Sequence, residues 1–215
     1  QYVASFQGAA LPAVLSYPLF FTLRAVFAEQ QSMNMLQATL QAYAAAFEDV
    51  SVLGTFVDNH DNVRFLFVQP DFTLYANALT YVLLGQGIPI IYYGTEAGFN
   101  GGADPLNREP LWPGFSYNVS ALPIGLYIKS LTSLRRSVGL TAATPQVQRY
   151  STDNFYAFTR GTGASSVFVA LTNVGASGGV VSISITYHPY PDGTKLCNWL
   201  SSNATWPAPP SSFAS

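Results

Sequence analysis

The chain has 215 residues and a mass of 23.2 kDa; 49% of its residues are hydrophobic and only 9% are charged. This composition excludes an intrinsically disordered chain, because disordered chains carry too little apolar surface to form a core. Nine basic and eleven acidic residues give a formal net charge of −2, which excludes the basic surface that nucleic acid or an anionic membrane would require.

The sequence also lacks an apolar run that could span a membrane and a second cysteine that could pair with the first. No uninterrupted apolar run reaches the roughly 20 residues of a spanning helix, and the first residues carry no basic segment ahead of an apolar one. We therefore expect a soluble chain without a signal segment. The single cysteine, Cys197, rules out an internal disulfide and a thiolate zinc cluster. Two glycosylation sequons, at Asn118 and Asn203, and a low lysine content favour a secreted protein.

Residues 33–47 have the periodicity of an amphipathic helix. The apolar residues Leu36, Leu40, Tyr43 and Phe47 recur at spacings of four, three and four, which places them on one helix face. A helix is therefore predicted over this range.

The next segments alternate between strand-like and helical patterns. Residues 51–57 and residues 88–93 are short apolar runs with the pattern of strands buried on both faces of a parallel sheet. A helix is predicted between them, over residues 73–84. This order of strand, helix and strand is typical of βαβ units, in which consecutive strands lie parallel.

The second half of the chain changes character. A polar loop is predicted over residues 97–114, and a helix over residues 122–137 ends in two arginines, which suit the negative end of a helix dipole. Short β-branched or aromatic runs then follow, separated by small-residue turns: residues 154–160, 167–171 and 180–188. Apolar and polar residues alternate in the last run, which predicts one buried and one exposed face. A separate antiparallel β module is therefore predicted.

Acidic residues concentrate in the first half of the chain. Residues 1–110 hold nine of the eleven. Five lie within or beside the two polar clusters that follow the predicted parallel strands: Asp58, Asp61, Glu96, Asp104 and Glu109. The loops after parallel strands converge at one edge of a sheet, where α/β folds build their active sites. A functional site is therefore expected at this edge.

The first cluster places an imidazole beside a carboxylate, at His60 and Asp61, with Arg64 three residues further on. The pattern by itself leaves two interpretations open. In one, these groups form a catalytic or binding site. In the other, Asp61 caps a helix and His60 is an ordinary buried histidine.

Three motifs in this region resemble a known family. Residues 56–65, Phe-Val-Asp-Asn-His-Asp-Asn-Val-Arg-Phe, look like the fourth conserved region of the α-amylase family of glycoside hydrolases. Residues 87–96, Gly-Ile-Pro-Ile-Ile-Tyr-Tyr-Gly-Thr-Glu, are similar to that family's eighth barrel strand. Residues 101–109, Gly-Gly-Ala-Asp-Pro-Leu-Asn-Arg-Glu, resemble the loop after it in secreted fungal α-amylases. A weaker likeness covers residues 8–17, which look like the stretch entering barrel strand six, and the β module.

The resemblance implies an α/β plus all-β fold. It implies the C-terminal part of a (β/α)8 TIM barrel, about strands 6–8, in residues 1–143, and part of an antiparallel β-sandwich in residues 144–215. Cys197 resembles a half-cystine whose partner would lie beyond residue 215. The unpaired barrel edges would expose apolar strand faces, which predicts self-association.

The resemblance also implies roles for the residues after the first strand. Asp61 matches the carboxylate that stabilises the oxocarbenium-like transition state. His60 matches the imidazole that binds the same sugar. Asn59 is assigned to substrate binding as well.

Further sugar contacts are implied for Asp104 and Arg108, which match residues that contact the next glucose units, and for Arg64. An alternative stays open for Arg108, because it could form a loop-stiffening ion pair with Glu109 or Asp104, an interaction of small energetic value.

The two carboxyl groups that perform retaining hydrolysis are not found. They stand about 5–5.5 Å apart, one as nucleophile and one as acid. In the resembled family the nucleophile follows the fourth strand in a Gly-x-Arg-x-Asp context and the acid follows the fifth, and this sequence contains neither motif. The calcium ligands of fungal amylases also precede this region, so no metal site and no cofactor are predicted in this chain.

The predicted function is hydrolysis of internal α-1,4-glucosidic bonds in starch and maltooligosaccharides, with retention, by a secreted extracellular enzyme. This chain would carry only the stabilising and sugar-binding part of the site and would be inactive alone. Its predicted partner is an α-glucan, with no nucleic acid and no membrane. Two alternatives stay open: a noncatalytic amylase-derived carbohydrate-binding or assembly module, and a piece of a longer enzyme.

Overall fold

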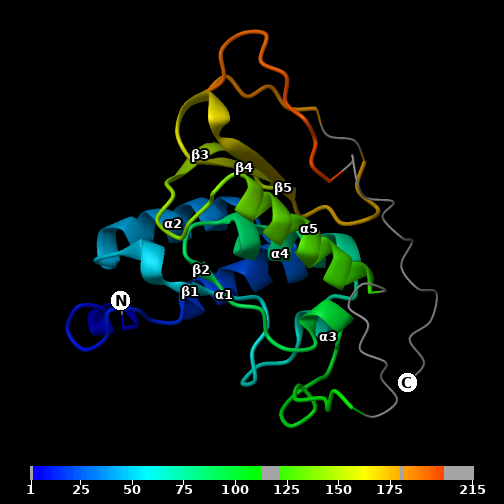
Figure 1. Ribbon diagram of the computed structural model, residues 1–215. Helices are drawn as coiled ribbons and strands as arrows, with labels where there is room; N and C mark the ends of the chain where they lie inside the picture. The colour runs from blue at the N-terminus through cyan, green and yellow to red at the C-terminus, as the bar shows by residue number, and fades with distance from the viewer. Residues whose placement is uncertain (1, 113–121, 180–181, 201–215) are drawn as a thin grey trace.

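The computed structural model describes residues 2–112, 122–179 and 182–200. Within these ranges helices pack beside a pair of short parallel strands, and a three-stranded antiparallel sheet lies against the helical layer (Figure 1). The helices are α1 (Tyr17–Leu23), α2 (Asn34–Ala46), α3 (Phe65–Val68), α4 (Phe72–Leu84) and α5 (Pro123–Ser137). The strands are β1 (Gly54–Thr55), β2 (Ile88–Pro89), β3 (Gln146–Ser151), β4 (Phe155–Arg160) and β5 (Val167–Thr172).

β1 and β2 lie side by side and parallel, with Gly54 paired to Ile88 and Thr55 to Pro89. On the other edge of β1, Leu15 forms an isolated parallel bridge to Gly54. The parallel order predicted from the sequence is therefore confirmed. Both strands are shorter than the predicted runs, since Val50–Val52 forms a 3-10 turn and the ladder ends after two residues.

The second apolar run was predicted to be buried on both faces of the sheet, but it is partly exposed. Ile88 and Ile90 are 44% and 38% exposed. Among the described residues β2 pairs with β1 alone, so these side chains stay partly open to solvent. A Cβ atom at Gly54 would touch the side chains of Ile90 and Leu15, which shows that these two residues share one face of the strand pair.

The three predicted helices are confirmed as α2, α4 and α5 to within a residue or two. α2 buries Leu36 and Tyr43, both on the face that the apolar spacing predicted. α4 is enclosed almost completely, because it lies between α5 and the antiparallel sheet.

The ends of α4 are fixed by side chains from other segments. At its start the Asp71 carboxylate accepts hydrogen bonds from the Thr73 and Leu74 N–H groups, at 2.7 and 3.3 Å. At its end the Arg135 Nη1 donates to the Leu83 carbonyl at 2.8 Å. A helix leaves its first N–H groups and last C=O groups without internal partners, and these contacts satisfy some of them.

β3, β4 and β5 form an antiparallel sheet with β4 in the middle. β4 and β5 match the runs predicted over residues 154–160 and 167–171. β3 was not predicted, because it contains Gln146, Gln148 and Arg149 and lacks an apolar run. The strand predicted over residues 180–188 is wrong in its described part, 182–188, which pairs with no strand. Residues 180 and 181 lie outside the described residues.

The antiparallel sheet shares one apolar core with the helices. Tyr156 and Phe158 of β4 and Leu171 of β5 belong to the same buried cluster as Leu79 and Tyr81 of α4. Because the core is continuous across residues 143 and 144, the division into two domains at this point stays a prediction. None of the described helices is long and apolar enough to cross a membrane.

Arg160 ties the sheet to the end of α4. Its side chain is fully buried, and its guanidinium donates to the carbonyls of Thr141, Thr144, Leu84 and Gly85. These hydrogen bonds to backbone carbonyls replace the water that the buried guanidinium has lost. A charged arginine is costly to bury unless its N–H groups are paired in this way.

Candidate active site

The polar segment after β1 is shaped by a side-chain turn at Asn59. The Asn59 Oδ1 accepts hydrogen bonds from the backbone N–H groups of Asp61 and Asn62, at 2.8 and 3.0 Å, and from the Asn62 Nδ2 at 3.0 Å. Such an Asx turn fixes the backbone without a regular element. The side chains of His60 and Asp61 extend from this turn and are 62% and 54% exposed.

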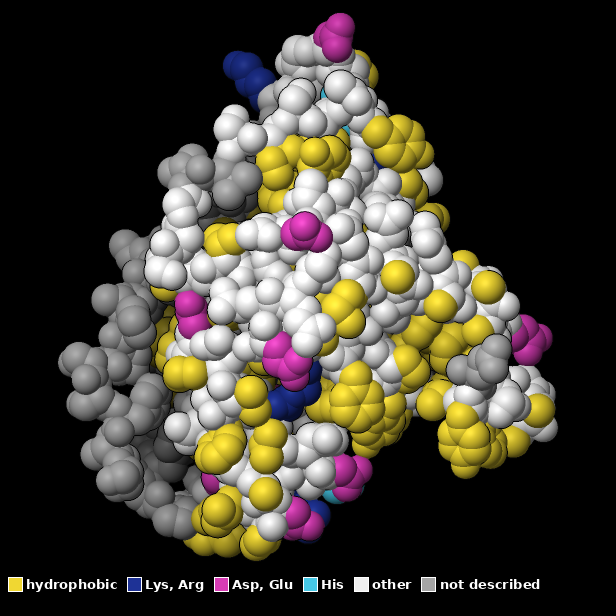
Figure 2. Space-filling view, turned by 180° about the vertical axis from the view of Figure 1, so that it is seen from behind, with side chains coloured by type: hydrophobic (Ala, Val, Ile, Leu, Met, Phe, Trp, Pro, Cys, Tyr) yellow, Lys and Arg dark blue, Asp and Glu magenta, His cyan; other side chains and the backbone are white. Residues whose placement is uncertain are grey.

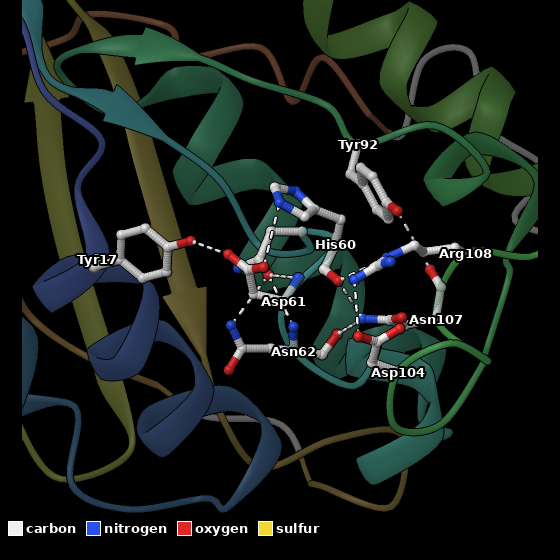
Figure 3. A network of polar contacts seen from close by, with 9 residues as sticks. Tyr17, His60, Asp61, Asn62, Tyr92, Asp104, Asn107 and Arg108 are labelled. Carbon is white, nitrogen blue, oxygen red and sulfur yellow. Dashed lines mark hydrogen bonds and ion pairs between the residues drawn. The ribbon is translucent and has the colours of Figure 1, made fainter.

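This geometry contradicts the alternative of a buried histidine and a helix cap. His60 is exposed, and the first N–H of α3, that of Phe65, donates to Asp58 at 2.7 Å rather than to Asp61. The Asp61 carboxylate is instead held by two neighbours. Its Oδ1 lies 3.2 Å from the His60 Nε2, and its Oδ2 accepts a hydrogen bond from the Tyr17 hydroxyl at 3.0 Å (Figure 3).

Tyr17 begins α1 and reaches the site from a different element. Its ring packs edge-on against the ring of Phe56, with centroids 5.2 Å apart, which limits its orientation. Burial raises the pKa of Tyr17, and the hydrogen bond to Asp61 and the charge of that carboxylate raise it further. The hydroxyl therefore stays protonated at neutral pH and remains a donor.

The loop after β2 clamps the backbone on both sides of Asp61. The Asn107 Nδ2 donates to the carbonyls of His60 and Asn62, at 2.8 and 2.9 Å, and the Asn107 side chain is fully buried. The Arg108 Nε donates to the same His60 carbonyl at 3.3 Å. Figure 3 shows these contacts converging from the loop side of the site.

Asp104 and Arg108 form an ion pair on the rim of the site. The Arg108 Nη2 lies 2.9 Å from the Asp104 Oδ2, and the two side chains are 46% and 54% exposed, respectively. Of the pairings left open for Arg108, the one with Asp104 is therefore present. Because both groups remain about half exposed and surface ion pairs are weak, this pair adds little to stability.

Arg64 lies beneath this surface. Its side chain is fully buried, and its Nε lies 2.6 Å from the Glu109 Oε2. The guanidinium carbon stands 4.5 Å from the ring centroid of Tyr92, an arrangement that stabilises a cation. These contacts with Glu109 and Tyr92 brace the loop after β2, and a sugar contact by Arg64 stays a prediction.

Glu109 joins the same brace from the loop after β2. Its Oε1 accepts a hydrogen bond from the Gly101 N–H at 2.6 Å, and the Arg64 N–H donates to the Gly101 carbonyl at 3.1 Å. A side chain at Gly101 would collide with the Leu106 carbonyl and with Glu109, so only glycine permits this close approach.

Asp58, one of the acids in the first polar cluster, is 3% exposed and serves the interior. Besides the N–H at the start of α3, it accepts hydrogen bonds from the Tyr75 hydroxyl at 2.6 Å and the Thr95 hydroxyl at 3.3 Å. Burial, followed by the charge of Asp58, raises the pKa of Tyr75 well above its ordinary value. Asp58 therefore anchors the loop and does not face the open surface.

The structure joins four of the predicted residues, His60, Asp61, Asp104 and Arg108, in one polar network supported by Asn59. Two members were not singled out by sequence reasoning. Tyr17 lies 44 residues from Asp61 and carries no spacing signal, and Asn107 stands within the quoted loop motif without a role. Among the described residues no group of three or more His, Cys, Asp or Glu side chains could hold a metal ion.

Comparison with known proteins places this geometry in a family context. The family model described as "Alpha amylase, catalytic domain" matches residues 4–154. Alpha-amylase 1 of Schwanniomyces occidentalis is 33% identical over 204 residues, which cover 90% of this chain and 38% of that protein. The alpha-amylase of Saccharomycopsis fibuligera is 36% identical over 190 residues, which cover 86% of this chain and 37% of that protein. The chain thus spans less than two fifths of the length of these relatives.

Solved structures give a consistent picture. The alpha-amylase from Malbranchea cinnamomea superposes with a TM-score of 0.74 and 32% identity, covering 81% of this chain and 37% of that one. A cyclomaltodextrin glucanotransferase named CldA gives a TM-score of 0.71 and 30% identity, covering 80% of this chain and 35% of that one. The described fold is therefore similar to part of these larger proteins.

Proposed function

The chain belongs to the alpha-amylase catalytic-domain family of glycoside hydrolases, and from this premise we propose that it carries the sugar-binding and transition-state-stabilising part of an alpha-amylase site. The reaction of the complete site would be hydrolysis of internal α-1,4-glucosidic bonds in starch and maltooligosaccharides, with retention. The proposed substrate is an α-glucan.

One observation carries this proposal: the exposed Asp61 carboxylate is held by a separate neighbour on each oxygen. A carboxylate fixed in this way accepts hydrogen bonds from sugar hydroxyls without having to reorganise when positive charge develops on the sugar ring. Asp61 is therefore the proposed transition-state stabiliser, and the exposed imidazole of His60 is proposed to bind the same sugar.

Three further residues complete the proposed site. Asp104 and Arg108 are proposed to contact the next glucose units from the rim, where both side chains are open to solvent. Asn59 is proposed to contribute through the turn that presents His60 and Asp61. Water exclusion by a bound glucan would strengthen each of these charged hydrogen bonds.

The architecture proposed for the chain follows from the same family membership. Residues 1–143 would form about strands 6–8 of a (β/α)8 barrel, with β1 and β2 as the last two, and residues 144–215 would form part of a β-sandwich. The parallel pairing of β1 with β2 and the antiparallel order of β3, β4 and β5 support this proposal. A secreted, extracellular location is proposed on the likeness to fungal alpha-amylases.

We also propose that the isolated 215-residue chain binds glucan without cleaving it. The sequence contains neither the Gly-x-Arg-x-Asp motif of the nucleophile nor the motif of the acid, and without both carboxyl groups the covalent route is not open. The competing candidate is a noncatalytic carbohydrate-binding or assembly module that works in this form. Both candidates predict that the chain binds glucan without cleaving it. Cleavage of starch would distinguish either of them from an amylase that is active as the isolated chain.

The experiment measures maltotriose binding by calorimetry and reducing-sugar release from soluble starch on one preparation whose intact mass is verified. The wild-type chain should bind maltotriose and release no sugar. Asp61→Asn should weaken binding about tenfold, the loss of one charged hydrogen bond. Asp153→Asn is the matched control, since the Asp153 carboxylate accepts hydrogen bonds from the Ser32 and Asn34 side chains, and it should bind like the wild type.

Two results would contradict the proposal. Equal affinity in the wild type and in the Asp61 variant would remove Asp61 from the sugar site. Sugar release by a mass-verified 215-residue chain would show that another carboxylate has taken over the chemistry.

A further inference from the structure

A half-buried arginine at the end of α1 contacts the segment that carries Asp61, here called the site loop, residues 59–64. Arg24 follows the last residue of α1 and begins a π turn, Arg24–Ala28. Its Nη1 donates a hydrogen bond to the Val63 carbonyl at 2.6 Å, across 39 residues of chain. π turns are rare and occur frequently at functional sites, and this one begins at the residue that contacts the site loop.

The site loop is held from two sides. From the loop after β2, Asn107 donates to two of its backbone carbonyls. From the side of α1, Arg24 donates to a third carbonyl, that of Val63. Figure 3 shows Tyr17, which begins α1, and Asn107 on opposite sides of Asp61. The backbone that presents Asp61 is therefore fixed between two separate parts of the fold.

Three side chains on one face of α1 make the contacts with this region. Tyr17, Phe20 and Arg24 are spaced by three and four residues, so they lie along one side of the helix. Tyr17 donates to the Asp61 carboxylate, and the guanidinium carbon of Arg24 stands 5.4 Å from the ring centroid of Phe20. The buried ring of Phe20 stacks on Phe56, just before the site loop, with centroids 5.3 Å apart. This aromatic pair fills the space between the two polar contacts.

α1 is anchored to the strand that leads into the site loop. The Ser16 N–H donates to the Gly54 carbonyl of β1 at 2.8 Å, and the Gly54 N–H donates to the Val14 carbonyl at 3.0 Å. Within α1, the Leu19 N–H donates to the Tyr43 hydroxyl of α2 at 2.6 Å. Helix and loop therefore share one rigid base, which is what a support for a binding group requires.

The charge of Arg24 strengthens its contact. Burial lowers the pKa of Arg24, and the negative charges of Asp58 and Glu29 act in the opposite direction. An arginine stays protonated at neutral pH in proteins, so the bond to the Val63 carbonyl has a charged donor. Such bonds are stronger than those between neutral groups.

We propose that Arg24 is a positioning residue for Asp61, which holds the backbone on the C-terminal side of this carboxylate while Tyr17 holds the carboxylate itself. Arg24 touches no sugar in this proposal and acts on binding through Asp61. Only the choice of an α-glucan as ligand rests on the proposed function, because the contacts of Arg24 are observed without one.

The test is a double-mutant cycle, with maltotriose binding to the full 215-residue chain measured by calorimetry. Arg24→Met removes the donor at similar side-chain length and should weaken binding about threefold to tenfold. In the Asp61→Asn background the same change should weaken binding less than twofold. The effects of two residues that act through one group are not additive.

Arg135→Met is the matched control. Arg135 of α5 is also partly buried, which lowers its pKa, and its Nη1 also donates to a backbone carbonyl, that of Leu83, at 2.8 Å. Urea denaturation should show a comparable loss of stability in Arg24→Met and Arg135→Met. Only Arg24→Met should bind maltotriose more weakly, whereas a merely structural role would make the two variants alike.

A second variant and a second readout complete the experiment. Arg24→Lys keeps the charge near Asp58, so the fold is retained, but lysine lacks the fixed planar donor group of arginine. Its affinity should lie between those of the wild type and Arg24→Met. NMR of the ligand-free proteins should show shifted imidazole signals of His60 in both Arg24 variants and unchanged signals in Arg135→Met.

This proposal and the proposed function fail separately. Equal affinity of the wild type and the Arg24 variants, or an equal effect of Arg24→Met in both backgrounds, would overturn the positioning role and leave the proposed function standing. A wild type that does not bind maltotriose would contradict the proposed function. The ligand-free His60 signals then decide the positioning role: a shift confined to the Arg24 variants supports it, and unchanged signals overturn it.

Discussion

At the scale of single residues, the site depends on how the Asp61 carboxylate is presented. Asp58 and Asp61 are three residues apart, yet Asp58 is almost fully buried and bonds to the interior, whereas Asp61 is exposed and bonds to His60 and Tyr17. The difference arises from the Asn59 turn, which reverses the backbone between the two acids. One carboxylate therefore anchors the loop in the interior, and the other stays open to solvent.

Asn107 gives a test of whether the loop after β2 positions this carboxylate. Asn107→Ala removes the two hydrogen bonds to the His60 and Asn62 carbonyls. We expect the free energy of unfolding to fall by about 1–3 kcal/mol, because two hydrogen bonds from a fully buried side chain are lost. We also expect maltotriose to bind about tenfold more weakly, since the backbone on both sides of Asp61 is released; calorimetry measures this change.

Asn77→Ala is the matched control for that variant. Asn77 also makes two hydrogen bonds, from its Nδ2 to the Thr73 carbonyl and from the Thr172 N–H to its Oδ1, but it lies on α4. The control should lose comparable stability with unchanged affinity for maltotriose. If both variants bound maltotriose equally well, Asn107 would be a structural residue only.

At the scale of elements, α4 packs against α5 and β5, and Asp71 fixes its start. Besides capping α4, the Asp71 carboxylate accepts a hydrogen bond through Oδ2 from the Ala176 N–H at 2.8 Å, which ties the turn after β5 to the helix. Gly175 permits this contact, because its φ of 72° is left-handed and a side chain there would collide with Asp71.

The cap predicts a measurable loss of stability. Asp71→Ala should lower the free energy of unfolding by about 1–2 kcal/mol in urea denaturation, because a helix cap and a link between elements are lost together. Asp49→Ala is the control: its exposed side chain accepts from Ser51 in a three-residue turn, so about 0.5 kcal/mol or less is expected. Equal losses in the two variants would contradict the connecting role of Asp71.

At the scale of the whole molecule, the strand pair presents a partly exposed apolar face. Leu15, Ile88 and Ile90 are 48%, 44% and 38% exposed, and Leu15 and Ile90 meet over Gly54. Figure 2 shows apolar side chains gathered in patches on the face opposite that of Figure 1, with few charges between them. Exposed strand edges and contiguous apolar surface favour association, so we propose that the chain associates with itself through this face.

Sedimentation at micromolar concentration tests this association. The wild-type chain should sediment as a dimer or larger species, and Ile90→Lys should shift it towards monomer, because a charge on the face must be desolvated on association. Leu106→Lys is the control, since Leu106 is 66% exposed on the loop after β2, away from the strand pair. A monomeric wild type would contradict the proposal.

Much of the fold follows from local sequence patterns. The helices α2 and α4 were predicted because their apolar spacing depends on residues within a few positions of one another, and the parallel order of β1 and β2 follows from the helix between them. The patterns failed where pairing depends on distant segments. β3 forms from polar residues because it lies beside β4, whereas residues 182–188 alternate correctly yet pair with no strand among the described residues.

The same division applies to the candidate site. The sequence by itself determined that His60 and Asp61 follow a buried strand, and it determined the family motifs around them. Only the tertiary structure decided that Asp61 is exposed, that Arg64 is buried against Glu109, and that Tyr17 donates to Asp61 across 44 residues. The reason is physical: periodicity records which residues a segment buries, but burial and hydrogen bonding of a charged group depend on what distant parts of the chain bring against it.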